Sequence, residues 1–221
     1  MDAESYAEYH RARFEAIMET AKQQKPDPGS VVLDVGPGPL TAMLRSHYRQ
    51  VHTLGFKTSA IFSTDEKSPH HEFDLRAAEN SGRWIELPAF DLIVFSEVIE
   101  HVYVKPSGIL AFLASGLGPD GVIVCTTPNV LAFHKRMRAV LGRAPFDRWT
   151  SGHYTEFTRH ELERFASEAG LEVRAHHYSN YFGYVGSPLS KRAVKTVDAI
   201  TGVVPSLRRG HIIVLRKSAP A

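Results

Sequence analysis

Several features that would define a specialised protein class are missing from this sequence. A single cysteine, Cys125, excludes an internal disulfide and favours the cytoplasm as the compartment. No run of about 18 apolar residues is present, so no transmembrane span is expected. Internal repeats, low-complexity segments, a phosphate-binding P-loop and a Ser-His-Asp arrangement are also absent. The 221 residues are therefore expected to form one domain, 1–221.

The formal net charge is only +2, but the cations are unevenly distributed. Basic residues accumulate between 135 and 148 and again after 172. They either form an ordinary solvated surface or attract an acidic or phosphorylated small molecule, including one carried on a membrane surface. Nucleic acid is not an expected partner, because Thr127-Pro128-Asn129 is not a base-flipping motif of the Asn/Asp-Pro-Pro-Tyr type. No oligomeric state is predicted.

Apolar runs alternate with segments of helical spacing along the chain. The pattern predicts an N-terminal helix in 3–23 and strands at 31–35, 51–56, 72–74, 91–96, 122–126, 171–178 and 211–215. Helices are expected at 41–48, 107–117 and 158–169, and a turn at 118–121. Thr158 and Glu161 form a capping box at the start of the last helix. This alternation predicts an α/β fold with a doubly wound sheet.

Two segments, near 130–152 and 180–210, are inserted into this minimal pattern. Loops beyond the carboxyl ends of strands build the binding site in α/β sheets. The first segment follows the fifth strand and is therefore a candidate cover for a substrate site. Apolar residues from Leu189 to Val204 predict an amphipathic helix in the second, which either joins that cover or forms a dimer surface.

The most informative segment runs from Val31 to Thr41 and reads VVLDVGPGPLT. Its apolar run predicts a buried parallel strand with the acid Asp34 near its end. Gly36 and Gly38 allow a tight turn and the close approach of a ligand. A carboxylate here would repel the pyrophosphate of a dinucleotide. It would attract the ammonium and sulfonium groups of S-adenosylmethionine (SAM), which is therefore the expected cofactor.

Three motifs resemble class I SAM-dependent methyltransferases. The first is Asp34-x-Gly36-x-Gly38, and the second, FDLIVFSEVIEHV at 90–102, is similar to the fourth-strand motif of the small-molecule branch, types 11 and 23. GHYTEFT at 152–158 resembles a further segment of that branch. The resemblance covers roughly 30–178 and implies a seven-stranded, mostly parallel Rossmann-like sheet whose last strand is antiparallel. It also implies methyl transfer to a small-molecule acceptor, with a hydroxyl of a sugar or glycolipid-type molecule favoured.

The resemblance assigns residues to the cofactor site. Asp34, Gly36, Pro37 and Gly38 form the turn after the first strand. Ser96 and Glu97 follow the fourth strand, where family members line the methionine end of the cofactor. Asp74 ends the third strand, where the family often has an acid near the adenine.

The end of the second strand departs from the family pattern. Family members usually place there an acid that holds the ribose, whereas this chain has Phe56 and Lys57. Phe56 is then the expected cofactor contact at this position, and Asp65 or Glu66 could replace the missing acid. The departure keeps two alternatives open: a catalytically degenerate binding or partner protein, and an NADP-dependent oxidoreductase in which Lys57 meets the 2′-phosphate.

Methylation of an alcohol requires a group that takes the hydroxyl proton. Among twelve histidines, His101 lies one short turn after the fourth strand and His153 lies in the GHYTEFT segment. These two are the candidate catalytic bases. Glu97 and His101, four residues apart, could form a hydrogen bond or half of a metal site. No third ligand follows at a suitable spacing, so no metal is predicted.

Overall fold

A seven-stranded sheet forms the centre of the computed structural model, which describes residues 8–56, 68–146, 152–180 and 191–219. The strand order is β3-β2-β1-β4-β5-β7-β6. The strands are β1 (Val31–Val35), β2 (Gln50–Gly55), β3 (His70–Glu72), β4 (Phe90–Ser96), β5 (Leu117–Pro128), β6 (Leu171–Ser179) and β7 (Gly210–Lys217). Only β7 runs antiparallel to its neighbours, β5 and β6. The predicted α/β sheet with an antiparallel last strand is confirmed.

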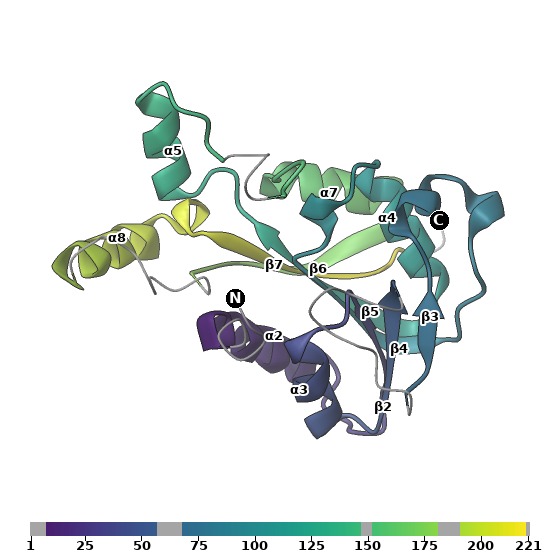
Figure 1. The fold of residues 1–221 in the computed structure, drawn as a ribbon. Helices are drawn as coiled ribbons and strands as arrows, with labels where there is room; N and C mark the ends of the chain where they lie inside the picture. The colour runs from purple at the N-terminus through teal and green to yellow at the C-terminus, as the bar shows by residue number, and fades with distance from the viewer. Residues whose placement is uncertain (1–7, 57–67, 147–151, 181–190, 220–221) are drawn as a thin grey trace.

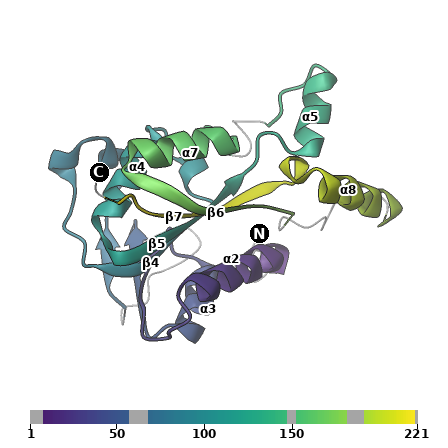
Figure 2. The same ribbon diagram turned by 180° about the vertical axis from the view of Figure 1, so that it is seen from behind.

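Helices cover both faces of the sheet (Figures 1 and 2). On one face lie α2 (Arg11–Gln24) and α3 (Pro39–His47), packed through side chains such as Ile17 and Leu44. On the other lie α4 (Pro106–Ser115) and α7 (Arg159–Glu168), packed through Phe112 and Leu162. The described part also contains short 3-10 helices: η1 (Leu75–Glu79), η2 (Ser81–Arg83), η3 (Ile99–His101) and η4 (Pro205–Leu207). Burial on both faces explains why the central strands are continuous apolar runs.

Local sequence signals set the helix ends. The capping box of α7 is confirmed, because the Thr158 N–H donates to Glu161 Oε2 at 2.8 Å and the Glu161 N–H donates to Thr158 Oγ1 at 3.2 Å. Helix α3 begins at Pro39, two residues before the predicted start, because proline at the first helical position already has helical φ. Thr41 Oγ1 accepts the Gly38 N–H at 2.9 Å and closes this helix start.

Three further predictions differ from the structure. Strand β2 ends at Gly55, whose φ is +146°, so Phe56 lies beyond the strand. Strand β3 ends at Glu72, and Asp74 instead caps η1 by accepting the Arg76 N–H at 3.0 Å, a local bond that aspartate favours. The predicted turn at 118–121 is an irregularity within β5, between the pairs Phe90–Leu117 and Leu92–Val122.

Both inserted segments contain a helix. Helix α5 (Phe133–Val140) lies in the first and α8 (Lys191–Val203) in the second, and both project beyond one end of the sheet (Figures 1 and 2). The amphipathic helix predicted for the second segment is thus present, although Leu189 lies outside the described residues. Among the described residues, every helix is too short or too polar to cross a membrane.

Candidate active site

The candidate site lies where the strand order reverses, beyond the carboxyl ends of β1 and β4. The chain leaves β1 through Gly36, whose φ is +81°. A Cβ at this position would lie 2.8 Å from Val98 Cγ2, so the turn requires glycine in both conformation and space. Gly38 is extended and serves as the N-cap of α3. The predicted glycine turn therefore brings the backbone close to the residues that follow β4.

Asp34 places a buried carboxyl group beneath this turn. Its exposed fraction is 2%, and Thr41 Oγ1 donates a hydrogen bond of 2.5 Å to its Oδ2. Burial raises the pKa of Asp34 to about 7, while the Thr41 hydrogen bond and the charge of Arg45 act in the opposite direction. A cationic ligand group beside Asp34 would favour the charged carboxylate. The environment therefore suits a ligand that carries an ammonium group.

A small cavity of about 120 Å³ brings together most of the predicted cofactor residues. It is lined by Asp34, Gly36, Pro37, Gly38, Ser96 and Glu97, together with Arg13, Phe14, Pro39, Leu40 and Val98. Glu97 follows β4 in a left-handed conformation with φ +53°, which is uncommon for a residue other than glycine. Strain of this kind is often found at functional sites.

The sequence argument missed Arg13. Its side chain is buried at the small cavity, and its Nη1 lies 3.7 Å from Glu97 Oε2. Helix α2 therefore does more than cover the sheet, because it supplies a cation to the site. The available signal was a charged residue next to Phe14 in the apolar stripe of the predicted helix.

A second cavity of about 780 Å³ adjoins the first, and Gly36, Pro37 and Val98 line both. Phe56 and Asp74, both predicted as cofactor contacts, lie on its wall. Phe56 is 60% exposed. Asp74 accepts a 2.7 Å hydrogen bond from Arg76 Nη2, and the hydrogen bonds from Arg76 hold the pKa of Asp74 below its usual value. Both predicted residues therefore face one space, although neither belongs to a strand.

The proposed replacements for the ribose acid are Asp65 and Glu66. Lys57, Asp65 and Glu66 all lie outside the described residues. Lys57 is also the residue on which the NADP alternative depends.

The two predicted catalytic histidines come together although they are far apart in the sequence. Their ring centroids are 4.7 Å apart, with an angle of 77° between the ring planes. His101 Nδ1 lies 2.9 Å from the carbonyl oxygen of Gly152, and His153 Nδ1 lies 3.1 Å from Glu156 Oε1. His101 also lines the larger cavity. Desolvation lowers the pKa of His101, and the Gly152 carbonyl partly opposes this effect.

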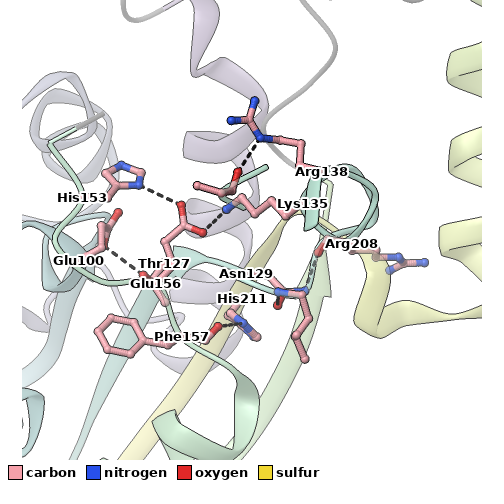
Figure 3. A network of polar contacts seen from close by, with 12 residues as sticks. Glu100, Thr127, Asn129, Lys135, Arg138, His153, Glu156, Phe157, Arg208 and His211 are labelled. Carbon is pink, nitrogen blue, oxygen red and sulfur yellow. Dashed lines mark hydrogen bonds and ion pairs between the residues drawn. The ribbon is translucent and has the colours of Figure 1, made fainter. Parts of the chain in front are cut away.

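Glu100, which the sequence argument also missed, lies beside these histidines. Its side chain is fully buried, and its Oε2 accepts a 3.1 Å hydrogen bond from Thr127 Oγ1 (Figure 3). Oε1 has no hydrogen-bond partner among the described residues. Burial, followed by the nearby charge of Glu97, raises the pKa of Glu100 well above its usual value. One ligand atom each from Glu100, His101 and His153 lie within 4.8 Å of one another.

A buried ion pair between Lys135 and Glu156 contacts His153 through the Glu156 carboxylate. Lys135 of α5 donates a short hydrogen bond to Glu156 Oε2, while the other oxygen of Glu156 contacts His153 (Figure 3). The Lys135 and Glu156 side chains are both buried. Burial favours the neutral carboxyl, but the contacts with His153 and Lys135 outweigh it and lower the pKa of Glu156. The first inserted segment is therefore tied to the site through Lys135.

Comparison with known proteins decides the family. The model of a family described as a methyltransferase domain matches residues 6–176. The chain belongs to this methyltransferase family. It is a SAM-dependent methyltransferase, with SAM as its cofactor, and the predicted type 11/23 branch is confirmed. The family match thereby replaces the NADP alternative.

Solved structures share the fold of this methyltransferase at low sequence identity. The SAM-dependent methyltransferase from Mesorhizobium loti is 14% identical, with a TM-score of 0.60 over 93% of this chain and 98% of that chain. The N-methyltransferase NodS from Bradyrhizobium japonicum WM9, in complex with S-adenosyl-L-homocysteine (SAH), is 12% identical, with a TM-score of 0.57 over 96% and 88%. No curated protein matches the chain.

The residues of this methyltransferase fit the cofactor. Gly36 has no side chain, a Cβ there would clash with Val98 Cγ2, and its backbone lines both cavities. The buried carboxyl of Asp34 lies at the smaller cavity, where it would meet the ammonium of SAM. Phe56 and Asp74 lie at the larger cavity, on the side where β2 and β3 end.

Proposed function

We propose that this methyltransferase methylates a hydroxyl group of a small molecule bound in the larger cavity. One observation carries the proposal: His101 lines the same cavity as Gly36 and Pro37 of the cofactor turn. SAM supplies the electrophilic methyl group when it is bound. The chain contributes alignment of the two reactants and activation of the hydroxyl.

Each of the two cavities would bind a different part of the cofactor. Asp34, Ser96 and Glu97 would hold the amino-acid end of the cofactor in the smaller cavity. Phe56 and Asp74 would contact its adenosine end in the larger one. The remaining wall of the larger cavity, which includes His101, is then available to the acceptor.

Aromatic side chains on this wall support an acceptor with a flat or ring-shaped body. Tyr103 and Tyr154 are 80% and 51% exposed, and their ring centroids lie 5.5 Å apart. Exposed aromatic rings offer a rigid apolar surface with a polar hydroxyl at one end. Arg76 lines the same cavity, but its guanidinium is paired with Asp74, so the two side chains together add no net charge to this wall. The aromatic rings favour a sugar, glycolipid-type or phenolic acceptor.

The hydroxyl would be activated at His101 and His153. Both rings contact a protein oxygen through Nδ1, and in His101, which lines the larger cavity, this leaves Nε2 as the atom that can act on the acceptor. As a general base, a positioned imidazole contributes on the order of 10² to 10⁴ in rate. The nearby carboxylate of Glu156 fixes the orientation of His153 and so belongs to the same arrangement.

Methyl transfer from isotopically labelled SAM to panels of sugars, phenols, amines and carboxylates tests this function. Mass spectrometry of the products should find the label on a hydroxyl oxygen. With that acceptor, His101→Ala should lower kcat by about 10² or more while changing SAM affinity by less than about threefold. The exposed His160→Ala on α7 is the matched control and should match the wild type. Transfer only to nitrogen, or full activity of His101→Ala, would contradict the proposal.

A further inference from the structure

We infer that helices α5 and α8 dock this protein on the surface of a membrane that contains anionic lipids. Both helices project beyond the same end of the sheet (Figures 1 and 2). They carry exposed apolar side chains next to cations, which is the composition of helices that lie in a membrane interface. The docking itself does not depend on the proposed function, whereas its consequence for the acceptor does.

Helix α5 leaves its apolar stripe largely in solvent. At the spacing of one helix face it carries Phe133, Met137, Val140 and, directly after its end, Leu141. Phe133 is half-buried, but Val140 and Leu141 are 79% and 67% exposed. The apolar stripe of a surface helix normally packs against the core. A stripe that faces away from the core indicates a binding surface instead.

The charge around this stripe has one sign. Residues 131–146 contain four Lys or Arg residues and no Asp or Glu. Lys135 belongs to the buried ion pair described above. No carboxylate in the described ranges forms an ion pair with Arg136, Arg138 or Arg143. The Nε atoms of Arg136 and Arg138 donate to backbone carbonyls, which do not neutralise a guanidinium.

Helix α8 adds a second surface of the same composition. Val203 is 83% exposed, and Ile200 and Val204 are also exposed. Arg192 and Lys195 are exposed cations on this helix. The helix contains three basic residues and one acid, so its charge also favours an anionic partner.

Asn129 joins the two helices near their bases. Its Nδ2 donates to the carbonyl oxygens of Ser206 and Arg208, at 2.9 and 2.7 Å (Figure 3). Asn129 lies shortly before α5, and Ser206 lies in η4, shortly after α8. The two exposed surfaces are therefore held at the same end of the molecule, where one membrane can contact both.

The combination of charge and apolar exposure favours an anionic bilayer over other occupants. Contact with a second copy of this chain through the same surface would bring like charges together. Nucleic-acid interfaces are polar and would leave Val140, Leu141 and Val203 uncovered. A bilayer interface offers phosphate groups to the arginines and acyl chains to the aliphatic side chains at once.

Docking through α5 would bring the acceptor site close to the lipid. Lys135 on α5 pairs with Glu156, and Glu156 contacts His153. The ring of His153 lies against His101, which lines the larger cavity. A sugar attached to a lipid would then enter this cavity while its acyl chains stay in the bilayer. This consequence rests on the proposed function and narrows its acceptor to the glycolipid type.

Co-sedimentation of the full-length protein with vesicles tests the docking. The wild type should bind phosphatidylcholine vesicles in which about one lipid in three is phosphatidylglycerol, and should bind pure phosphatidylcholine at least about tenfold more weakly. Arg136→Gln/Arg138→Gln should weaken binding at least about tenfold, because each cation near an anionic surface contributes about fivefold. The matched control, Lys22→Gln/Arg49→Gln, removes two exposed cations that precede β1 and β2 and should lose less than about threefold.

A fluorescent probe on α5 separates insertion into lipid from attraction between charges alone. Because Cys125 is buried, Val140→Cys can be labelled selectively with an environment-sensitive fluorophore. Its emission should shift to shorter wavelength on the anionic vesicles, whereas the same probe on Lys22→Cys should not shift. Val140→Ser/Leu141→Ser should weaken vesicle binding at least about tenfold, because it removes apolar area that the bilayer would bury.

Failure of the wild type to bind anionic vesicles would overturn the inference. Unchanged binding by the arginine or the serine variant, each shown to be folded by circular dichroism, would also overturn it. Tighter binding to a DNA oligonucleotide than to the vesicles would contradict the membrane as occupant. A dimer in sedimentation equilibrium that Val140→Ser/Leu141→Ser abolishes would contradict it in the same way.

Methyl transfer to a water-soluble hydroxyl acceptor, measured on the same samples, tests the proposed function separately. Arg136→Gln/Arg138→Gln should match the wild type in this assay and in SAH binding, because neither residue lines a cavity of the site. A protein that methylates the hydroxyl but binds no vesicles keeps the proposed function and loses the docking. A protein that binds anionic vesicles but methylates only nitrogen keeps the docking and loses the function.

Discussion

The protonation state of Asp34 depends on what binds beside it. Its carboxyl is almost completely buried and has a pKa of about 7, far above that of an exposed aspartate. A cation at this position would lower the pKa again. If the ammonium group of the cofactor binds beside Asp34, as we propose, its binding is coupled to release of a proton from Asp34.

This coupling predicts that SAH affinity rises with pH. Below pH 7 the carboxyl is largely protonated in the free protein, and its deprotonation must accompany binding of the ligand's ammonium group. Affinity should fall by up to about tenfold for each pH unit below 7 and level off above it. Calorimetry at several pH values, in buffers of different ionisation enthalpy, would measure both the affinity and the proton released. A pH-independent affinity between 5.5 and 8 would show that Asp34 does not face the ammonium.

Phe56 follows the end of β2, where the sequence resemblance leads us to expect an acid that holds the ribose. It is largely exposed at the larger cavity, immediately after Gly55. Phe56→Asp should therefore keep or tighten SAH binding, because a carboxylate there can accept hydrogen bonds from the ribose hydroxyls. Calorimetry compares the SAH affinity of this variant with that of Phe56→Ala. A large loss in the aspartate variant alone would mean that the new charge is repelled at this position.

At the scale of elements, the sequence predicted most of the strands and the helices between them, because apolar periodicity reports burial directly. It failed where a local hydrogen bond competes with the strand, as at Asp74, which caps η1. It also failed where contacts depend on the tertiary fold. The approach of His153 to His101 and the buried position of Glu100 arise only when segment 152–158 folds against the end of β4. Arg13 was missed because its position at the smaller cavity also depends on the tertiary fold.

The Lys135–Glu156 pair connects α5 to the segment that carries His153. Because both side chains are buried, removal of one partner leaves the other charge uncompensated. Lys135→Met should lower the free energy of unfolding by about 3–5 kcal/mol, and Lys135→Met/Glu156→Gln should recover part of this loss. Urea unfolding measures both, with exposed Lys195→Met on α8 as the control. Equal stability of Lys135→Met and Lys195→Met would show that the pair does not anchor α5.

At the scale of the whole molecule, the site is assembled from segments that the topology brings to the carboxyl ends of the central strands. The turn after β1, the residues after β4 and the segment before α7 all contribute, while α2 adds Arg13 from the opposite layer (Figure 1). The strand order reverses between β1 and β4, and this reversal opens the space that the two cavities occupy. The fold therefore determines the location of the proposed cofactor site, and individual side chains determine its charge.

Calorimetry at pH 8 with SAH and NADPH, on the wild type and on Asp34→Asn, tests the central claim most directly. Asparagine keeps the shape of Asp34 and a hydrogen-bond acceptor for Thr41 but removes the charge. The wild type should bind one SAH per chain and no NADPH, and folded Asp34→Asn should bind SAH at least about tenfold more weakly, a difference of about 1.4 kcal/mol. If the variant binds SAH within about threefold of the wild type, roughly 0.65 kcal/mol, the assignment of the cofactor's amino-acid end to Asp34 is contradicted.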